Sequence, residues 1–386
     1  MHSFNKPSNI TITCSKRLTP YLEQEITALG FKIKQVFPTA ILLAGSLNDC
    51  IILNLNLRTA SQVLYSLKKF KCDHPRTLYN EMRNIQWESV IPTDGYFSVT
   101  GNVRTDTVNN ALFANVTVKD AIADRFREKV QRRPDSGPAV DKTVIHLFWK
   151  DEEAEIFIDT SGETLSKHGY RKIPGKAPML ESLAAAAILA TNWDRQSPFV
   201  NPMCGSSTLA IEAALIATNR SPGLYRDNYA FMHIAGYSAE FYNQEKLKLN
   251  DQIKQLPGLK IIATDISEDA INISKINAGA AGVADLLSFE VCDFAETPVP
   301  GDEAGVVFFN PEYGDRLGDE IQLEDTYARM GDFMKKKCKG YTGYIFTGNL
   351  NLAKKIGLKA KRKIEFYNGK IDCRLLVYDL YAGSKQ

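Results

Sequence analysis

The second half of this sequence alternates short apolar segments with helical patterns, and that alternation constrains the fold more than any other feature. From residue 179 to residue 314 we expect a helix, a strand, a helix, a strand, a helix and two further strands. Strands separated by helices form parallel sheets covered on both faces, and such sheets bind ligands at the carboxyl ends of their strands. The sequence therefore predicts a doubly wound α/β domain with its site at four strand ends.

The first 160 residues follow a different order of elements. Up to residue 71 the pattern is typical of a ferredoxin-like α+β unit. We expect its strands at 9–13, 32–38, 40–45 and 49–57 and its helices at 19–30 and 59–70. Residues 72–160 then predict a strand, a long helix and a hairpin that turns at Asp151 and Glu152. A segment rich in Gly, Pro and basic residues follows, so we expect domains at 1–71, 72–160 and 161–386.

Composition excludes several classes of protein. Hydrophobic residues make up 44% and charged residues 24% of the chain, which is ordinary for a globular protein and excludes fibrous and disordered chains. No apolar segment approaches the ~20 residues that cross a bilayer, and the N-terminus has no secretory pattern. The seven cysteines are scattered without metal-binding spacing. We therefore expect a cytoplasmic protein with no membrane contact and no metal, and leave its oligomeric state open.

The first strand end lies in FVNPMCGSST, residues 199–208. Asn201 and Pro202 end an apolar strand, and Gly205 and its neighbours lead into a helix, so small residues and free N–H groups meet at the turn. Such a turn suits the polar end of a ligand. An ordinary strand-to-helix turn explains the same residues and, taken alone, is the better explanation.

Acidic residues close the next two strands. Asp265 in IIATDIS can accept hydrogen bonds from two ribose hydroxyls, although Ser267 and Glu268 after it also fit a helix N-terminus. Asp293 in EVCDFAE can face an adenine amino group or be a solvated loop acid. Three consecutive strand ends with these groups favour nucleoside binding.

The fourth strand ends in FFNPEYGDRLG, residues 308–318. Asn310 offers a side-chain carbonyl, Tyr313 offers an aromatic face, and Pro311 stiffens the backbone between them. This set suits an extruded base, whose exocyclic amine donates to carbonyl groups while the base stacks on the ring. A type I turn with proline in its usual place is the alternative.

These motifs resemble those of the THUMP-containing class I methyltransferases that methylate the N2 amine of guanine in RNA, particularly the members that act on large-subunit ribosomal RNA (UPF0020). The resemblance covers nearly the whole chain. In that family a ferredoxin-like lobe and a THUMP fold precede a Rossmann-like domain. The family's nucleoside loop usually reads close to DPMCGSGT, and its catalytic strand end reads NPPYGERLG. The segment SGETLSKHGYRKIPGKAPMLESLAAA and an insertion between Asn201 and Asp265 are also similar.

The resemblance implies S-adenosyl-L-methionine as methyl donor and RNA, most of all ribosomal RNA, as partner. It implies a cofactor site made of Asn201, Pro202, Cys204, Gly205, Ser206, Ser207, Thr208, Asp265, Ile266, Asp293, Phe294 and Asn310. It implies a catalytic set made of Asn310, Pro311, Glu312 and Tyr313. Accepting both hydrogens of the guanine amine localises its lone pair, and alignment with the donor methyl supplies orientation.

Two residues depart from the family pattern. Glu312 replaces the second proline of NPPY, and Ser207 replaces the second glycine of GSGT. Glu312 adds a carboxylate and an N–H to a stiff turn, while Ser207 is strained by of order 1 kcal/mol if its position needs a positive φ. Either change can slow or abolish turnover. His168 stands where arginine is common, a minor change.

Contacts with RNA require a local basic surface, because 47 Lys and Arg face 45 Asp and Glu in the whole chain. Cations cluster on the expected long helix, in the loop after it and in the segment before the α/β domain. We expect RNA contacts from Lys119, Arg125, Arg127, Lys129, Arg132, Arg133, Arg171 and Lys172, with Lys167 and Lys176 beside the last two. A solvated helix face explains the helix charges equally well.

Three other functions stay open. An N6-adenine-specific DNA methylase uses a similar Asn-Pro-x-aromatic strand end, although the N-terminal half is unexpected there. A catalytically impaired RNA-binding or ribosome-assembly module would tolerate Glu312 and Ser207. A nicotinamide-dependent oxidoreductase would need a G-x-G-x-x-G turn, which the stretch from Gly205 lacks. Within the insertion, Tyr229 and Phe231 either stack on RNA or pack beneath a loop.

Overall fold

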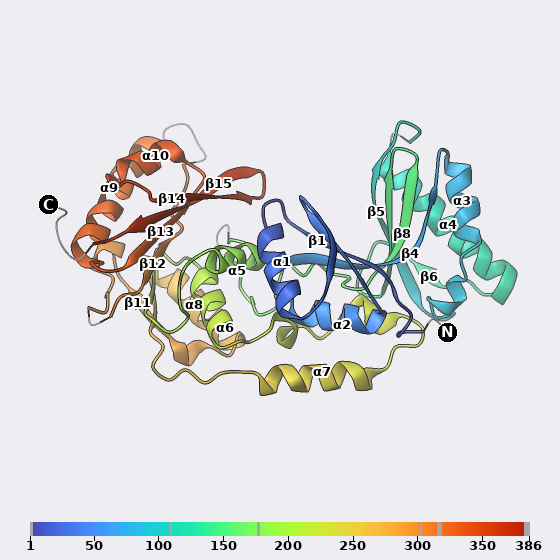
Figure 1. Ribbon diagram of the computed structural model, residues 1–386, viewed down its shortest axis with the longest axis horizontal. Coiled ribbons are helices and arrows are strands. Elements are labelled where there is room, and N and C mark those ends of the chain that lie inside the picture. The colour runs from blue at the N-terminus through green and yellow to red at the C-terminus, as the bar shows by residue number, and fades with distance from the viewer. Residues whose placement is uncertain (1–2, 109, 176–177, 302, 315–318, 382–386) are drawn as a thin grey trace. The chain divides into compact units, whose positions relative to one another are not determined.

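The computed structural model describes the chain except for residues 1–2, 109, 176–177, 302, 315–318 and 382–386. The chain folds into two compact units, and Figure 1 labels many of their elements. The first unit consists of Met1–Cys14, Leu22–Leu165 and Arg226–Lys248, and the second of Ser15–Tyr21, Ser166–Tyr225 and Leu249–Gln386. Residues 226–248, which lie within the expected α/β domain in sequence, therefore belong to the first unit.

An eight-stranded sheet organises the first unit, in the order β2-β3-β1-β4-β8-β7-β5-β6. Its first half is built from β1 (Ser8–Cys14), α1 (Thr19–Ala28), β2 (Ile33–Phe37), β3 (Ala40–Gly45), α2 (Leu47–Asn56) and β4 (Ala60–Lys71). Its second half is built from α3 (Pro75–Arg83), η1 (Trp87–Ser89), β5 (Tyr96–Arg104), α4 (Ala111–Val130), β6 (Asp135–Ser136), β7 (Thr143–Lys150) and β8 (Glu153–Asp159). Antiparallel pairing of β4 with β8 joins the two halves into one sheet.

Two elements of the first half correct the sequence prediction. A strand is expected at 49–57 and a helix at 59–70, but the structure has helix α2 and strand β4 there. A capping box starts α2, since Ser46 Oγ accepts from the Asp49 N–H and the Asp49 carboxylate accepts from the Ser46 N–H. Most of α2 is buried, so its apolar run looks like a strand. Pairing with both β1 and β8 fixes β4 as an inner strand.

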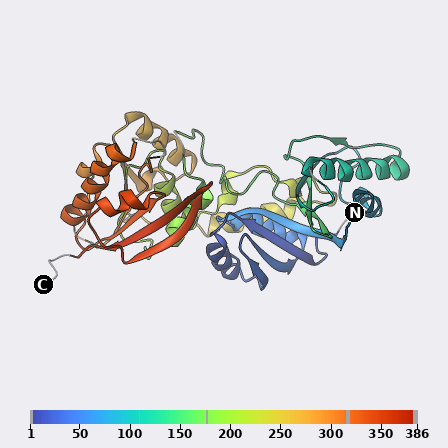
Figure 2. The ribbon, with the colours of Figure 1, turned by 90° about the horizontal axis from the view of Figure 1, so that it is seen from above.

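The second half has the expected strand, long helix and hairpin. β5 pairs in parallel with β7, and Lys150 of β7 pairs with Glu153 of β8 across the expected turn. α4 packs against β5 and α3, as Figures 1 and 2 show. The sequence analysis missed α3 and the two-residue β6, which pairs with β5.

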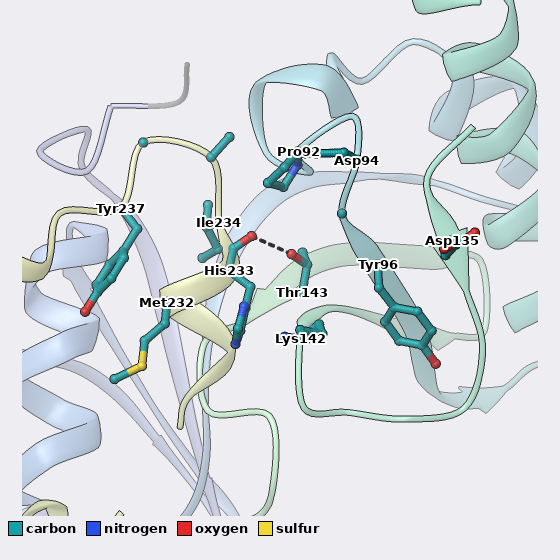
Figure 3. A pocket seen from close by; sticks show the side chains of 13 residues that line it. Pro92, Asp94, Tyr96, Asp135, Lys142, Thr143, Met232, His233, Ile234 and Tyr237 are labelled. Atoms are coloured by element: carbon teal, nitrogen blue, oxygen red, sulfur yellow. Dashed lines mark hydrogen bonds between the residues drawn. The ribbon is translucent and has the colours of Figure 1, made fainter. Parts of the chain in front are cut away.

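The inserted segment 226–248 packs onto this second half. Thr143 Oγ1 donates a hydrogen bond to the His233 carbonyl over 2.8 Å (Figure 3). Tyr229 and Phe231 are fully buried, with their rings stacked 5.0 Å apart. These two residues therefore pack within the unit and present no ring face to RNA. The segment contains η3 (Ala230–His233) and leads into α7 (Ala239–Asp251).

A cavity of about 500 Å³ lies beside these contacts in the first unit (Figure 3). Asp94, Asp135 and Lys142 are among the residues that line it. Carboxylates outnumber cations here, so the cavity does not have the positive charge that a phosphate backbone requires.

A seven-stranded sheet organises the second unit, in the order β11-β10-β9-β12-β13-β15-β14. Its strands are β9 (Phe199–Pro202), β10 (Ile261–Asp265), β11 (Leu287–Val291), β12 (Val306–Phe309), β13 (Thr342–Thr347), β14 (Arg362–Asn368) and β15 (Ile371–Asp379). Its helices are α5 (Glu181–Leu189), α6 (Thr208–Ala217), α8 (Glu268–Ala280), α9 (Asp319–Lys337) and α10 (Leu350–Lys355), with short η2 (Pro222–Tyr225), η4 (Ala284–Leu286) and η5 (Phe294–Glu296). Strands β9 to β13 are parallel and β15 is antiparallel, which confirms the predicted doubly wound α/β fold.

Both faces of the sheet are buried at β12, which explains why this strand is apolar throughout. Val307 and Phe309 belong to a core cluster that includes Met330 and Phe333 of α9. Successive strand residues point to opposite faces, and Phe308 accordingly lies on the other side, stacked on Tyr344. Within the described part of the chain no helix is long and apolar enough to cross a membrane. The described residues also contain no His, Cys, Asp and Glu cluster that could hold a metal ion.

Candidate functional site

Asn201 is the last residue but one of β9 and holds this strand to the neighbouring strand β12. Its Nδ2 donates to the Phe308 carbonyl over 2.8 Å, and the residue is fully buried. Its Oδ1 is also buried, and no described residue donates to it. An unsatisfied buried acceptor costs roughly 1–3 kcal/mol, so a ligand group that donates to this atom would be stabilising.

The loop from β9 to α6 curls tightly because three of its residues adopt positive φ. These are Met203 at 55°, Gly205 at 57° and Ser207 at 56°. A Cβ atom at Gly205 would meet no other atom within 4 Å, so open space lies beside the loop at this point. The loop thus has the close turn and the accessible backbone that its sequence predicts.

Ser207, one of the two departures, has a positive φ and a hydrogen-bond partner. Its Oγ donates to Ser274 Oγ of α8 over 2.8 Å, and Ser274 Oγ donates to the Gly205 carbonyl over 2.9 Å. The strain anticipated from the family pattern is present, and the hydroxyl chain offsets part of it. Sequence reasoning missed Ser274, because nothing in the motif points to a residue so far along the chain.

Asp265 ends β10 and contacts the same loop. Its Oδ2 accepts from the Gly205 N–H over 2.9 Å, and its Oδ1 accepts from the Ser267 N–H over 3.0 Å. Ser267 in turn caps α8. The helix cap is thus formed by Ser267, and a binding role for Asp265 is compatible with it. Ile266 between them is 73% exposed.

Asp293 follows β11 and is held by two donors. Its Oδ1 accepts from the Ala295 N–H over 2.9 Å and from Arg329 Nη2 over 2.7 Å. The hydrogen bond from Arg329 lowers the pKa of the Asp293 carboxyl. The same guanidinium lies 4.8 Å from the centre of the Phe294 ring. These contacts anchor the Asp293 carboxylate, and its side chain is still 35% exposed.

Asn310 and Tyr313 contact each other directly after β12. The Tyr313 hydroxyl donates to Asn310 Oδ1 over 3.0 Å, and burial raises the pKa of Tyr313, so the phenol keeps its proton. The Glu312 side chain is exposed, while its carbonyl accepts from the Tyr327 hydroxyl over 3.0 Å. Residues 315–318, the end of the predicted motif, lie outside the described residues.

Hydrogen bonds tie these strand ends to one another. The Cys204 N–H donates to the Thr264 carbonyl over 2.9 Å, and the Cys292 N–H donates to the Asp265 carbonyl over 3.0 Å. Together with the Asn201–Phe308 bond, these contacts place the ends of β11, β10, β9 and β12 side by side. One edge of the sheet thus carries the open loop after β9, the carboxylates of Asp265 and Asp293, and the amide of Asn310 beside the Tyr313 ring.

Comparisons with known proteins show which family the chain belongs to. Family models match three successive parts of the chain: the RlmL ferredoxin-like domain at 9–64, the THUMP domain at 75–159 and the RMKL-like methyltransferase domain (UPF0020) at 168–376. The third match covers more than half of the 386 residues. The chain belongs to the RMKL-like methyltransferase family. The family resemblance seen in the sequence is thereby confirmed.

Relatives of this RMKL-like chain extend along nearly all of it. A protein of Syntrophotalea carbinolica named ribosomal RNA large subunit methyltransferase K/L is 34% identical over 97% of the chain. The match covers 54% of that relative, so the chain spans about half of its length. Two solved structures match at a TM-score of 0.87. SMU.472, crystallised with SAH, is 27% identical and covers 99% of this chain and 100% of its own. A Listeria monocytogenes protein described as a predicted N6-adenine-specific DNA methylase is 31% identical and covers 97% of both chains.

The segment before α5 of this RMKL-like chain runs beside the loop after β9. Arg171 Nη2 donates to Thr208 Oγ1 over 2.8 Å and to the Met179 carbonyl over 2.6 Å. The N–H groups of Lys172 and Ile173 both donate to Asn277 Oδ1 of α8. The sequence analysis placed Arg171 among the RNA contacts and missed Asn277. The structure holds Arg171 against the first residue of α6 instead.

The surroundings of His168 and Cys204 indicate structural roles for both residues. His168 Nδ1 lies 2.7 Å from Glu212 Oε1, and both side chains are fully buried. Burial raises the pKa of the Cys204 thiol to about 12, so this cysteine is no thiolate nucleophile at neutral pH.

The cations of the RMKL-like chain that were expected to bind RNA differ in their exposure and in their ion pairs. Arg125 forms two hydrogen bonds with Glu88 and is only 12% exposed. Arg127 pairs with Asp124, and Lys129 lies 3.5 Å from Glu128. Arg132, Arg133 and Lys172 are exposed, and Lys119 is half-buried. Lys176 lies outside the described residues. Arg132 and Arg133 in the loop after α4 are thus exposed, whereas Arg125, Arg127 and Lys129 of α4 lie against acidic side chains.

Proposed function

We propose that this chain transfers a methyl group from S-adenosyl-L-methionine to the exocyclic N2 amine of a guanine in RNA, with 23S ribosomal RNA as substrate. One observation carries the proposal: the Asn201–Thr208 loop, Asp265 and the hydrogen-bonded Asn310 and Tyr313 occupy adjoining strand ends. The ribosomal RNA methyltransferase name of the Syntrophotalea relative and the SAH bound to SMU.472 support it.

The residues at the strand ends fit the donor nucleoside. Each carboxylate oxygen of Asp265 accepts one hydrogen bond and keeps a lone pair for a ribose hydroxyl. The space beside Gly205 is open, and Asn201 Oδ1 lacks a donor among the described residues. We assign Ile266, Asp293 and Phe294 to the adenine. S-adenosyl-L-methionine, when bound, supplies an electrophilic methyl group.

Asn310 and Tyr313 are then the residues that hold the target base. Asn310 Oδ1 accepts from Tyr313 with one lone pair and has a second for one hydrogen of the guanine amine. The Pro311 carbonyl accepts the other hydrogen, and the Tyr313 ring stacks on the base. Both bonds draw the amine lone pair out of conjugation with the ring, which makes the nitrogen nucleophilic.

The N-terminal half has the second role in the proposal. We assign RNA binding to the ferredoxin-like segment 1–71 and the THUMP segment 72–160, and methyl transfer to 161–386. Ribosomal RNA as substrate places the protein in the cytoplasm. The free state of all seven cysteines suits that reducing compartment.

Methyl transfer from labelled S-adenosyl-L-methionine to ribosomal RNA of a methylation-deficient strain tests the proposal. The label should appear in N2-methylguanine of 23S RNA. Asn310→Ala should lower kcat by about 100-fold or more, because it removes an acceptor at the reacting amine. Asn243→Ala, at an exposed position of α7, is the matched control.

Two outcomes would give different functions. Transfer to adenine in DNA, in competition with RNA, would favour the activity named for the Listeria relative, which the shared strand-end chemistry allows. No transfer and no SAH binding by calorimetry would end the enzyme interpretation and leave an RNA-binding module.

A further inference from the structure

A second cavity, of about 350 Å³, lies next to Tyr313 at the same sheet edge. It is lined by Gly348, Asn349, Leu350, Asn351, Asp372 and Arg374. Its volume falls within the range of ligand pockets, roughly 300–1,000 Å³. The residues come from the end of β13, the start of α10 and the start of β15, and neither the sequence motifs nor the proposed chemistry uses them.

Gly348 and Asn349 connect this cavity to the proposed base site. A Cβ atom at Gly348 would lie 3.1 Å from Tyr313 Cδ2, so the wall of the cavity touches the Tyr313 ring. Asn349 Nδ2 donates to the Tyr313 carbonyl over 3.1 Å. A nucleotide stacked on Tyr313 would therefore have its neighbour in the RNA within reach of the cavity.

Among the described residues that line the cavity, Arg374 is the one cation, and hydrogen bonds hold its guanidinium in a fixed plane. Nη1 donates to Asp372 Oδ1 and to the Cys373 carbonyl, and Nη2 donates to Asp372 Oδ2 over 3.2 Å. Nη2 also lies 3.7 Å from Glu365, which pairs with Arg17 over 2.6 Å. The side chain is 20% exposed. Because guanidinium donors lie in the plane of the group, these contacts leave its flat face as the surface that a ligand can use.

This arrangement favours a base over a phosphate. A phosphate would have to displace Asp372 from the in-plane donors of Arg374 and would lie beside a carboxylate, which repels it. A nucleobase needs only a flat cationic face and apolar contact, and Leu350 at the same cavity is 43% exposed. Arginine planes and aromatic rings are the usual stacking partners of unpaired RNA bases.

We propose that this cavity receives a nucleobase of the RNA next to the methylated guanine, stacked on the guanidinium face of Arg374. The proposal rests on the proposed function and adds a second base subsite to it. It makes Arg374 and Leu350 determinants of RNA sequence or shape around the target, with no contact to the methyl donor.

Substitutions of Arg374 separate stacking from charge. Arg374→Gln and Arg374→Lys should both lower kcat/KM for 23S RNA by about 10- to 100-fold, because a stacked base contributes that much to binding and lysine lacks the plane. Leu350→Ala should lower it in the same direction. The Kd for SAH should stay unchanged, as should the salt dependence of RNA binding. Arg195→Gln, exposed in the turn before β9 at the opposite edge of the sheet, is the control.

An abasic substrate gives the decisive measurement. An RNA oligonucleotide around the methylated guanosine carries a single abasic residue on its 5′ or 3′ side, and its Kd is measured with SAH present, so turnover is not needed. For one of the two positions, removing the base and substituting Arg374→Gln should each raise the Kd by the same factor. Combining the two changes should raise the Kd no further. Losses that add at both positions would overturn the proposal. A phosphate contact would also overturn it. In that case Arg374→Lys would bind RNA as the wild type does, and the salt slope of Arg374→Gln would be about one unit smaller.

The outcomes distinguish this proposal from the proposed function. Wild-type transfer to RNA together with unchanged binding by Arg374→Gln refutes the base subsite alone. Absence of both transfer and RNA binding by the wild-type protein refutes both.

Discussion

Ser207 shows how one residue can depart from a family pattern and still be accommodated. Its φ of 56° costs of order 1 kcal/mol for a residue with a Cβ, and its bond to Ser274 contributes about 1 kcal/mol. Ser207→Gly removes both effects, so its stability should match the wild type. Ser207→Ala keeps the strain and loses the bond, so it should be destabilised by about 1 kcal/mol. Thermal unfolding with and without SAH measures the difference.

Ser274→Ala is the partner control for that comparison. It should destabilise at least as much as Ser207→Ala, because it also removes the bond to the Gly205 carbonyl. If Ser207→Gly were more stable than the wild type by well over 1 kcal/mol, the hydroxyl chain would contribute nothing.

Glu312, the other departure, lies in the proposed catalytic turn with its side chain exposed. Proline at this position keeps the carbonyl that accepts from Tyr327 and restricts the backbone. We expect Glu312→Pro to raise kcat several-fold, because a stiffer turn loses less entropy when it holds the base. Glu312→Gln, which removes only the charge, should change kcat little. A large fall in kcat with either substitution would show that Glu312 takes part in the reaction.

At the scale of elements, the antiparallel pairing of β4 with β8 joins the two halves of the first unit into one sheet. Asp159 ends β8 and is fully buried, accepting from Ser161, Gly162 and Gln62. Burial raises the pKa of Asp159 to about 6, whereas the unfolded chain has a value of about 3.9. The folded state therefore binds the proton more tightly, and this group makes the protein less stable as pH rises from about 4 to 6.

Asp159→Asn should remove that pH dependence. Relative to the wild type, the variant should gain roughly 2–3 kcal/mol of unfolding free energy between pH 4 and pH 7. Tryptophan fluorescence in a Trp193→Phe background reports on Trp87 and Trp149, which both lie in the first unit. Asp135→Asn, at an exposed position of the same unit, is the control. A difference that stays constant with pH would mean that Asp159 is ionised without penalty.

At the scale of the whole molecule, the proposal divides RNA binding and methyl transfer between two compact units. Arg132 and Arg133 are the exposed cations in the loop after α4. Arg132→Glu with Arg133→Glu should weaken RNA binding and reduce the salt slope of log K by about two units, one for each phosphate that an arginine no longer neutralises. The Kd for SAH should not change, because the substitutions lie in the other unit.

Lys335→Glu with Lys336→Glu is the matched control for that double substitution. Both lysines are exposed on α9 of the second unit and pair with Asp332. An unchanged salt slope for the Arg132 and Arg133 variant would refute the assignment of RNA contacts to this loop.

The sequence by itself determined strands β9 to β12 of the second unit and the polar residues that follow them. Strands β9 to β12 are short apolar runs with polar residues at their ends, and this pattern is local enough to read without knowing which strands pair. The parallel order then brings Asn201, Asp265, Asp293 and Asn310 to one edge, because every such strand presents its carboxyl end on the same side. The family resemblance supplied what the chemistry at that edge would be.

Only the tertiary structure decided the features that depend on distant partners. Residues 47–56 form a helix and 60–71 a strand because of a cap at Ser46 and pairing with β1 and β8, which hydrophobic periodicity cannot show. Arg171 binds Thr208, and the segment 226–248 joins the first unit, for the same reason. Local sequence encodes propensity and the polarity of each position. Packing between residues far apart in the chain selects among the structures that this propensity allows.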